Sequence, residues 1–98
     1  MKVYLAGKIV GDRRYKAKFR AAAVELERRG YTVLNPAILP EGLTDADYMS
    51  ITMAMLYAAD AVVFLPDYRE SRGAMVEFNM CQRIGKDCLL YLGEIKTT

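Results

Sequence analysis

A serine, a glycine and a glutamate within seven residues form the part of this sequence best suited to chemistry. In "SRGAMVE", Ser71, Gly73 and Glu77 follow the apolar run "AVVFLP", so we expect them at the start of a helix that leaves a buried strand. Backbone N–H groups at a helix start bind anions such as phosphate, and a glycine there lets the anion approach closely. A carboxylate about one and a half turns further along would reach the sugar of a bound nucleotide.

Each of these residues also has a plain structural interpretation. Ser71 followed by Gly73 is a common helix cap that needs no ligand. Glu77 shares the helical face of Ala74 and Cys81, but at the helix edge it would pair with an exposed Arg or Lys. Periodicity alone does not decide between the inward position and the edge position of Glu77. An inward carboxylate without a partner is costly to bury, so it would need a role.

A tyrosine in the first predicted strand is a candidate partner for this glutamate. Tyr4 lies in "KVYLA", residues 2–6, near the edge where the helix of Glu77 begins. Its phenol would hydrogen-bond the carboxylate of Glu77. The alternative is a core tyrosine whose hydroxyl reaches water.

The composition excludes several other chemistries. The 98 residues include no histidine, and Cys81 and Cys88 form no CxxC or Cys/His arrangement. Zinc binding and Ser-His or Cys-His catalysis are therefore not expected, and we predict neither a metal nor a cofactor. The sequence shows no signal-peptide cleavage pattern and no apolar span of membrane length, which predicts a cytoplasmic protein with reduced cysteines and no membrane partner.

Basic residues gather in one segment although the net charge is only +2. They are Arg13, Arg14, Lys16, Lys18, Arg20, Arg28 and Arg29. Basic residues interleaved with alanine are typical of a solvated helix face. No aromatic interleaving accompanies them, so nucleic-acid binding is the least favoured function.

The elements that position these residues alternate between strand and helix. Strands are predicted at 2–6, 31–35, 60–66 and 88–92, and helices at about 13–29, 44–59 and 71–85. Asp12 is the expected N-cap of the first helix and Thr44 that of the second. This order predicts one α/β domain over 1–98, with three layers, Rossmann-like or flavodoxin-like. Its four-stranded parallel sheet has the order 2-1-3-4, and the first helix covers the face opposite the other two.

Ligands of such sheets bind beyond the carboxyl ends of the strands. The segments "GKIVGD", "NPAILPEG" and "DYRESRG" should meet at this edge. Asn35, the first residue of the second segment, is accordingly a candidate binding residue.

Four segments together resemble a known superfamily. "VYLAGKIVGD", "YTVLNPA", "AADAVVFLPD" and "ESRGAMVE" are similar to the nucleoside 2-deoxyribosyltransferase-like superfamily, and most closely to its short DUF4406 branch, over about residues 2–91. Characterised relatives move 2-deoxyribose between bases or hydrolyse the N-glycosidic bond of deoxynucleoside 5′-monophosphates.

The resemblance implies a role for each candidate residue. It assigns the nucleophile that attacks the anomeric carbon to Glu77 and the tyrosine that orients it to Tyr4, and it places the 5′-phosphate on Ser71 and Gly73. Further phosphate contacts are implied for the loop after the first strand, at Gly7, Lys8, Ile9 and Gly11. The implied substrate is a nucleoside or nucleotide, with the base, the sugar, and hydrolysis or transfer left open.

Two departures from the family pattern count against these roles, and the first of them favours a second hypothesis. Thr52 stands where the enzymes have an aspartate, and neither Asp45 nor Asp47 is placed equivalently. The chain also ends soon after the fourth predicted strand, so we expect no fifth strand and no C-terminal segment lent to a neighbouring subunit. The alternative to an N-glycosidase or transferase is a non-catalytic module that senses or sequesters a nucleotide.

The small size of the chain also predicts self-association. So small a core predicts a homodimer or tetramer, through a second helix that contains Met49, Met53 and Met55.

Overall fold

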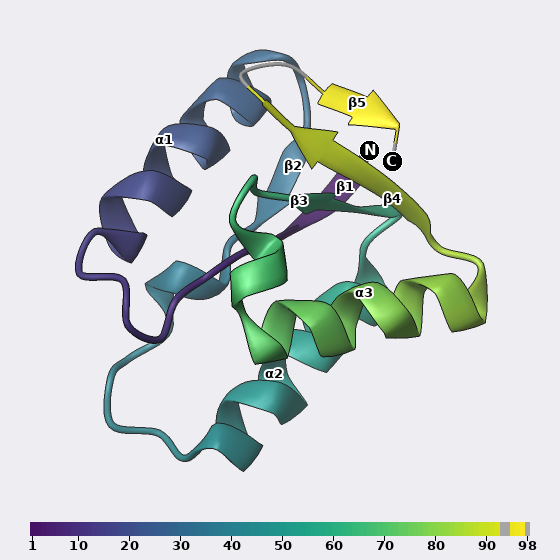
Figure 1. The fold of residues 1–98 in the computed structure, drawn as a ribbon. Helices are drawn as coiled ribbons and strands as arrows, with labels where there is room; N and C mark the ends of the chain where they lie inside the picture. Colours follow the sequence, from purple (N-terminus) through teal and green to yellow (C-terminus); the bar gives the residue numbers. More distant parts are fainter. Residues whose placement is uncertain (93–94, 98) are drawn as a thin grey trace.

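Strands and helices alternate along the chain in the computed structural model, which describes residues 1–92 and 95–97 (Figure 1). The strands are β1 (Lys2–Ala6), β2 (Thr32–Leu34), β3 (Ala61–Phe64), β4 (Asp87–Tyr91) and β5 (Ile95–Thr97). The helices are α1 (Tyr15–Arg28), α2 (Asp45–Ala58) and α3 (Arg72–Ile84). Two short 3₁₀ helices, η1 (Pro36–Ile38) and η2 (Tyr68–Glu70), lie in the connections after β2 and β3.

The sheet has the order β2-β1-β3-β4-β5. Its first four strands are parallel, with Val3 opposite Val33 on one side and Ala61 on the other. The predicted order 2-1-3-4 is confirmed. The expectation that the chain lacks a fifth strand is wrong, because β5 pairs antiparallel with β4. An antiparallel neighbour needs no crossover helix, and three residues carry too little pattern to be recognised in sequence.

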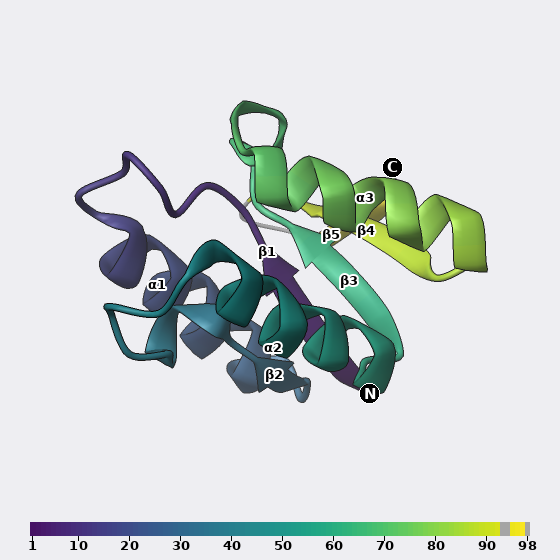
Figure 2. The same ribbon diagram turned by 90° about the horizontal axis from the view of Figure 1, so that it is seen from below.

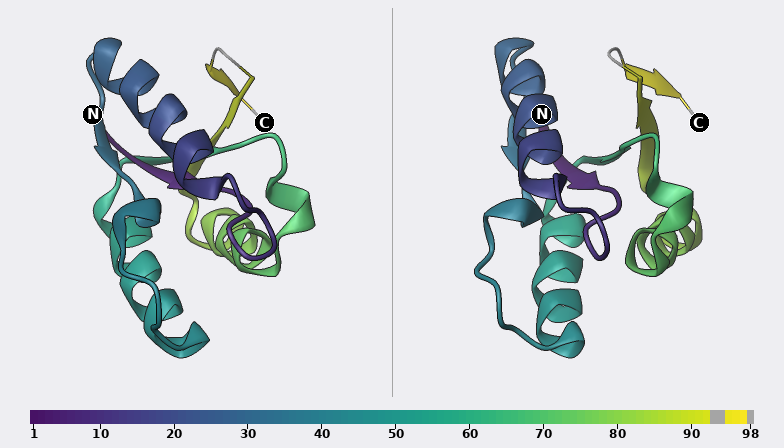
Figure 3. Two further views of the ribbon diagram at one scale, coloured as in Figure 1. Left: turned by 90° about the vertical axis from the view of Figure 1, so that its left-hand side faces the viewer. Right: turned by 60° about the vertical axis from the view of Figure 1, so that its left-hand side comes forward.

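The helices cover opposite faces of the sheet, as predicted. Side chains alternate along β1, so Val3 and Leu5 pack with α1 on one face. Tyr4 and Ala6 pack with α2 and α3 on the other. Figure 2 shows α2 and α3 in front of the strands, and Figure 3 shows α1 set apart from them. The three layers are therefore α1, the sheet, and α2 with α3.

The helix starts are fixed by local hydrogen bonds, with one correction to the sequence analysis. Thr44 caps α2 through a reciprocal capping box with Asp47, as predicted. Asp12 does not cap α1, whose N-cap is Arg14. The Asp12 carboxylate instead accepts the Arg14 N–H at 2.9 Å and binds Lys18. Asp12 thus shapes the turn that precedes the helix.

Glycines end two of the helices. Gly30 follows α1 with φ of +96°, and Gly85 caps α3 with φ of +71°. Both lie in the left-handed region, where a side chain is strained. Gly85 therefore determines where α3 ends. The candidate site lies at the other end of this helix.

Candidate functional site

Glu77 lies inside the protein. Only 5% of its surface is exposed, and it shares the inner face of α3 with Ala74 and Cys81. No Arg or Lys forms an ion pair with it among the residues that the structure describes. The inward alternative of the sequence analysis is confirmed, and the edge position with a salt bridge is excluded.

Tyr4 is the main partner of this buried carboxylate. Its side chain is 1% exposed, and its hydroxyl donates a hydrogen bond to Glu77 Oε2. The bond joins the middle of β1 to the second turn of α3. The predicted Tyr4–Glu77 contact is confirmed, and the alternative of a phenol in water is wrong.

Thr52 on α2 completes a network that we call the Glu77 network: Tyr4, Thr52 and Glu77. Thr52 is 9% exposed, and hydrogen bonding by its side chain lowers the pKa of both Glu77 and Tyr4. It also lies 3.4 Å from the Met49 carbonyl oxygen, a long hydrogen bond. Three elements, β1, α2 and α3, thus each bring one polar side chain to a single buried point.

Burial dominates the acid–base properties of this network. Desolvation raises the pKa of Glu77 from 4.5 to about 7, although hydrogen bonds from Tyr4 and Thr52 act in the opposite direction. Desolvation, reinforced by the neighbouring carboxylate, also raises the pKa of Tyr4 above its usual 10. Tyr4 is therefore a permanent donor, while Glu77 changes its charge near neutral pH.

The start of α3 has fewer free donors than the sequence suggests. Ser71 caps the helix as predicted, its Oγ accepting the Ala74 N–H at 3.1 Å. Its own N–H does not point outward, because it donates to the Tyr68 carbonyl at 3.2 Å. The 3₁₀ turn η2 makes this bond, and nothing in the sequence signalled it. Among the described groups, the N–H groups of Arg72 and Gly73 have no partner and are available to an anion.

Gly73 leaves open space at this helix start. A Cβ at this position would meet only Met49 Cε and Ser71 Oγ, each at 3.9 Å, which is ordinary contact. The fold therefore does not need a glycine here. Space in front of two free N–H groups is what a bound phosphate requires.

The glycines after β1 have structural reasons of their own. A Cβ on Gly7 would lie 3.0 Å from Leu65 Cβ and 3.2 Å from Asp67 Oδ1. Gly11 has φ of +82° in the turn before α1. Packing and backbone conformation account for both glycines, so their phosphate contacts stay a prediction.

The other predicted binding residues are also engaged by the protein. The Lys8 N–H donates to Asp67 Oδ1 at 3.1 Å, and Lys8 Nζ lies 3.6 Å from Glu70. Ile9 packs against the core on the α1 side. The Asn35 side chain accepts the Ala37 N–H at 2.9 Å, which caps η1. Lys8 is thus held beside Asp67 and Glu70, whereas Ile9 and Asn35 have local structural roles.

Sequence reasoning missed a second polar cluster at the same edge, which we call the Lys18 network: Lys8, Asp12, Lys18 and Asp67. Lys18 Nζ bonds Asp12 Oδ2 at 2.6 Å, the Lys8 carbonyl at 2.8 Å and Asp67 Oδ2. It ties the loop after β1 to the loop after β3. Asp67, which directly follows a predicted buried strand, was a signal for this cluster. Lys18 could not be distinguished in sequence from the other basic residues of its segment.

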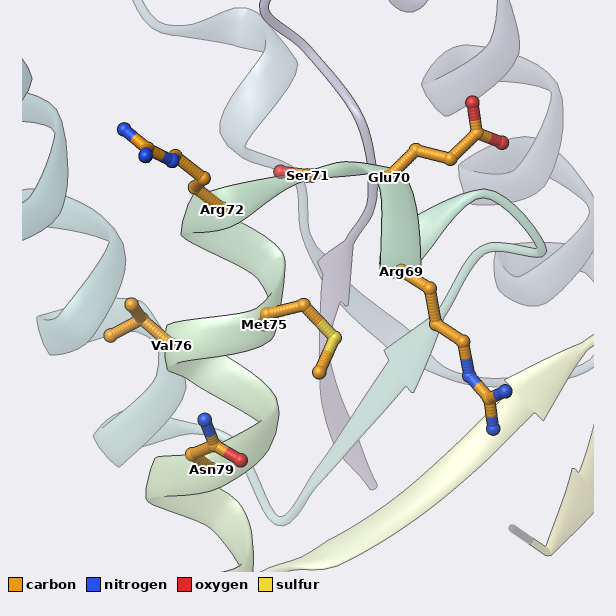
Figure 4. Close-up of a pocket in the computed structure, with 7 residues that line it drawn as sticks. All are labelled: Arg69, Glu70, Ser71, Arg72, Met75, Val76 and Asn79. Atoms are coloured by element: carbon orange, nitrogen blue, oxygen red, sulfur yellow. The ribbon is translucent and has the colours of Figure 1, made fainter.

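Two surface cavities lie near α3, and neither is lined by Glu77. One, of about 430 Å³, lies outside the start of α3 and is lined by residues that include Arg69, Ser71, Arg72 and Met75. Figure 4 shows the Glu70 and Arg72 side chains pointing away from each other around Ser71. The other adjoins Cys81 and Cys88. The first cavity thus runs along the outer face of α3 past Met75, Val76 and Asn79, and Gly73 does not line it.

Two further features are absent from the described part of the chain. No three His, Cys, Asp or Glu residues lie together there in an arrangement that would hold a metal ion. None of its helices has the length and apolar character needed to cross a membrane.

The fold is similar to that of a protein of known structure. The chain matches a solved structure of 2-deoxyribosyltransferase from Bacillus psychrosaccharolyticus with a TM-score of 0.72 and 20% identity, over 92% of this chain and 71% of that one. That enzyme is a biocatalyst for the industrial synthesis of antiviral and antitumoral nucleosides. No curated protein matches the sequence.

The sequence also matches a protein family. The family described as "Domain of unknown function (DUF4406)" matches residues 1–90, which is nearly the whole chain. The chain therefore belongs to the DUF4406 family and has the fold of a 2-deoxyribosyltransferase.

Proposed function

We propose that this protein binds a nucleoside or its 5′-monophosphate and cleaves the N-glycosidic bond, with Glu77 as the nucleophile. The observation that carries the proposal is the buried Tyr4–Glu77 hydrogen bond. Glu77 lies four to five residues, a little over one helical turn, after the free N–H groups of Arg72 and Gly73. An anion site and a carboxylate at this separation match the phosphate and the anomeric carbon of one nucleotide. The fold of a 2-deoxyribosyltransferase supports the same substrate class.

The chemistry follows from the charge that develops on the sugar. When the base departs, the sugar becomes oxocarbenium-like, and a carboxylate within reach stabilises or captures it. The hydroxyl of Tyr4 holds one oxygen of Glu77, which leaves the other to face the sugar. Water then completes hydrolysis, or a second base completes transfer.

Base release tests this proposal. The purified protein is incubated with a panel of nucleosides and 5′-monophosphates, and free base is measured by mass spectrometry. The parent should release base, and Glu77→Gln should lose at least about a hundredfold in rate while still binding the nucleotide. Glu27→Gln, on the exposed face of α1, is the matched control and should keep the parent rate. Turnover that survives Glu77→Gln would contradict the role of Glu77.

The second candidate function is nucleotide binding without turnover. Thr52 favours it, because a hydroxyl stands at the point in the Glu77 network where the resemblance implies an acid. This alternative expects nucleotide retained by the parent and no free base from any member of the panel. Retained nucleotide together with released base would exclude it.

We also propose that the protein acts in the cytoplasm as a homodimer or tetramer. Met53 and Met55 on α2 pack partly against the core, while Tyr57 beside them is 54% exposed. An apolar helix surface of this kind is suited to contact with a second copy. Light scattering at high micromolar concentration should give at least twice the monomer mass, and a monomer would remove this part of the proposal.

A further inference from the structure

Glu77 differs from the neighbouring carboxylates in having no cation. Asp12 and Asp67 both bind Lys18, and Glu70 lies 3.6 Å from Lys8. Within the described part of the chain, only hydroxyl groups bond Glu77, and no Arg or Lys influences its pKa. Glu77, the most buried of these carboxylates, thus has no positively charged partner among the described residues.

A buried carboxylate of this kind favours a positively charged ligand. Ionised carboxylates are costly to bury unless an opposite charge lies within a few ångströms. The hydroxyls of Tyr4 and Thr52 satisfy hydrogen bonds of Glu77 but add no charge. A ligand with a positive centre beside Glu77 supplies what the protein lacks.

When Glu77 is ionised as the nucleophile, the same network contains no other good acid for a departing base. A neutral base leaves as an anion unless a group protonates it during cleavage. Burial raises the pKa of the Tyr4 hydroxyl, and the Thr52 hydroxyl is not acidic in the physiological range. Asp67 is held by Lys18 and by the Lys8 N–H.

One further carboxylate shares a helical face with Thr52. Asp45 stands seven residues earlier on α2, about 10 Å along the helix axis. It lies in the exposed first turn rather than in the Glu77 network. Asp45 is therefore a competitor for the role of acid that a test has to control.

From these two features, and resting on the proposed N-glycosidase function, we infer that the site takes N-glycosides of cationic bases, such as pyridinium nucleosides and their 5′-monophosphates. Such a base is already positively charged next to Glu77, and it leaves as a neutral molecule without needing a proton. The tyrosine and the threonine then only have to hold the carboxylate.

The bond changes balance without an added reagent. The C1′–N bond breaks, and both of its electrons go to the ring nitrogen, which leaves as a neutral pyridine. The sugar cation is captured by a Glu77 oxygen and then by water, or by water directly. One water molecule is consumed, C1′ gains a hydroxyl, and one proton passes to solvent. Nothing is oxidised or reduced.

Binding of a matched ligand pair tests the inference without requiring turnover. The probes are nicotinamide riboside 5′-monophosphate and its dihydronicotinamide form, which share the sugar, the phosphate and the ring and differ by one hydride and the positive charge. Calorimetry at about pH 8, where Glu77 is mostly ionised, should show at least about tenfold tighter binding of the cation. Glu77→Gln should remove this preference, and Glu27→Gln should keep it. Equal affinities in the parent would overturn the inference.

Turnover separates this inference from the proposed function. Nicotinamide release from the cationic monophosphate should be at least about a hundredfold faster than base release from neutral pyrimidine 5′-monophosphates. Equal rates would overturn the inference and leave the N-glycosidase proposal standing. A loss of neutral-base release in Asp45→Asn would also overturn it, because Asp45 would then be the acid. Cation-selective binding without release of any base would support the ligand class and contradict catalysis.

Discussion

The Lys18 network and the Glu77 network differ in how their charges are balanced. In the first, a lysine bonds two carboxylates and a carbonyl oxygen that are only partly shielded from water. In the second, a carboxylate is almost fully buried, and the described part of the chain gives it hydroxyl partners and no cation. A cluster whose charges cancel holds two loops together. A cluster that contains an unbalanced negative charge is suited to binding a ligand.

Stability against pH should distinguish the two networks most strongly. Glu77 has a folded-state pKa of about 7, above its ordinary 4.5, so in this window the folded protein binds more protons than the unfolded chain. The free energy of unfolding therefore falls as pH rises from 4.5 to 7, by about 3 kcal/mol for the full shift. Urea denaturation should show this loss in the parent and not in Glu77→Gln.

The Lys18 network supplies the internal control for that titration. Hydrogen bonding to Lys18 lowers the pKa of Asp12, so the stability it contributes is present above its ordinary pKa and lost as pH falls through the lowered value. This acid-side loss should appear equally in the parent and in Glu77→Gln. Parallel profiles of the two proteins between pH 4.5 and 7 would show that Glu77 is not buried as described.

Removal of the lysine should cost the next largest amount. Lys18→Met leaves Asp12 and Asp67 as neighbouring carboxylates without a cation, and we expect a loss of about 2 kcal/mol in the free energy of unfolding. Lys16→Met is the matched control on the same helix, because its 3.6 Å pair with Glu41 is exposed and worth well under about 1 kcal/mol. Equal losses in the two variants would remove the distinction between a structural cluster and a surface pair.

Two glycines at this edge should respond differently to the same change. Gly7→Ala places a methyl group 3.0 Å from Leu65, which we expect to cost about 1–2 kcal/mol. Gly73→Ala meets no atom closer than 3.9 Å, so stability should change by less than about 0.5 kcal/mol. The affinity for inorganic phosphate should nevertheless fall in Gly73→Ala, as measured by calorimetry. Unchanged phosphate affinity would place the anion elsewhere.

The contrast between the networks also shows what the sequence can reveal. Buried strands separated by helices determine a parallel sheet almost without ambiguity, and the order 2-1-3-4 follows from right-handed crossovers. The orientation of Glu77 did not follow from periodicity, because an edge position satisfied the pattern equally well. It depends on Tyr4, 73 residues away. Lys18 and Asp67, separated by 49 residues, were missed for the same reason.

Local signals failed only where the connections are irregular. Ser71 has the sequence of a simple cap, and its side chain behaves as one. Its N–H is taken by Tyr68 because η2 leads directly into α3, and a three-residue 3₁₀ turn has no recognisable pattern. The proposed anion site therefore begins one residue later than the motif implies, at Arg72.

The smallest expected effect concerns the hydroxyl of Thr52. Thr52→Val keeps the shape of the side chain and removes a hydrogen bond that lowers the pKa of Glu77, so this pKa should rise further. The cost above pH 7 should be about 0.5–1 kcal/mol, the worth of one hydrogen bond to a partly charged acceptor. A ¹³C NMR titration of the Glu77 carboxyl, assigned with Glu77→Gln, measures the midpoint directly. Thr52→Ser should restore it, since serine keeps the donor. A midpoint that is the same in the threonine, valine and serine proteins would leave Tyr4 as the sole polar partner of Glu77 and reduce Thr52 to packing.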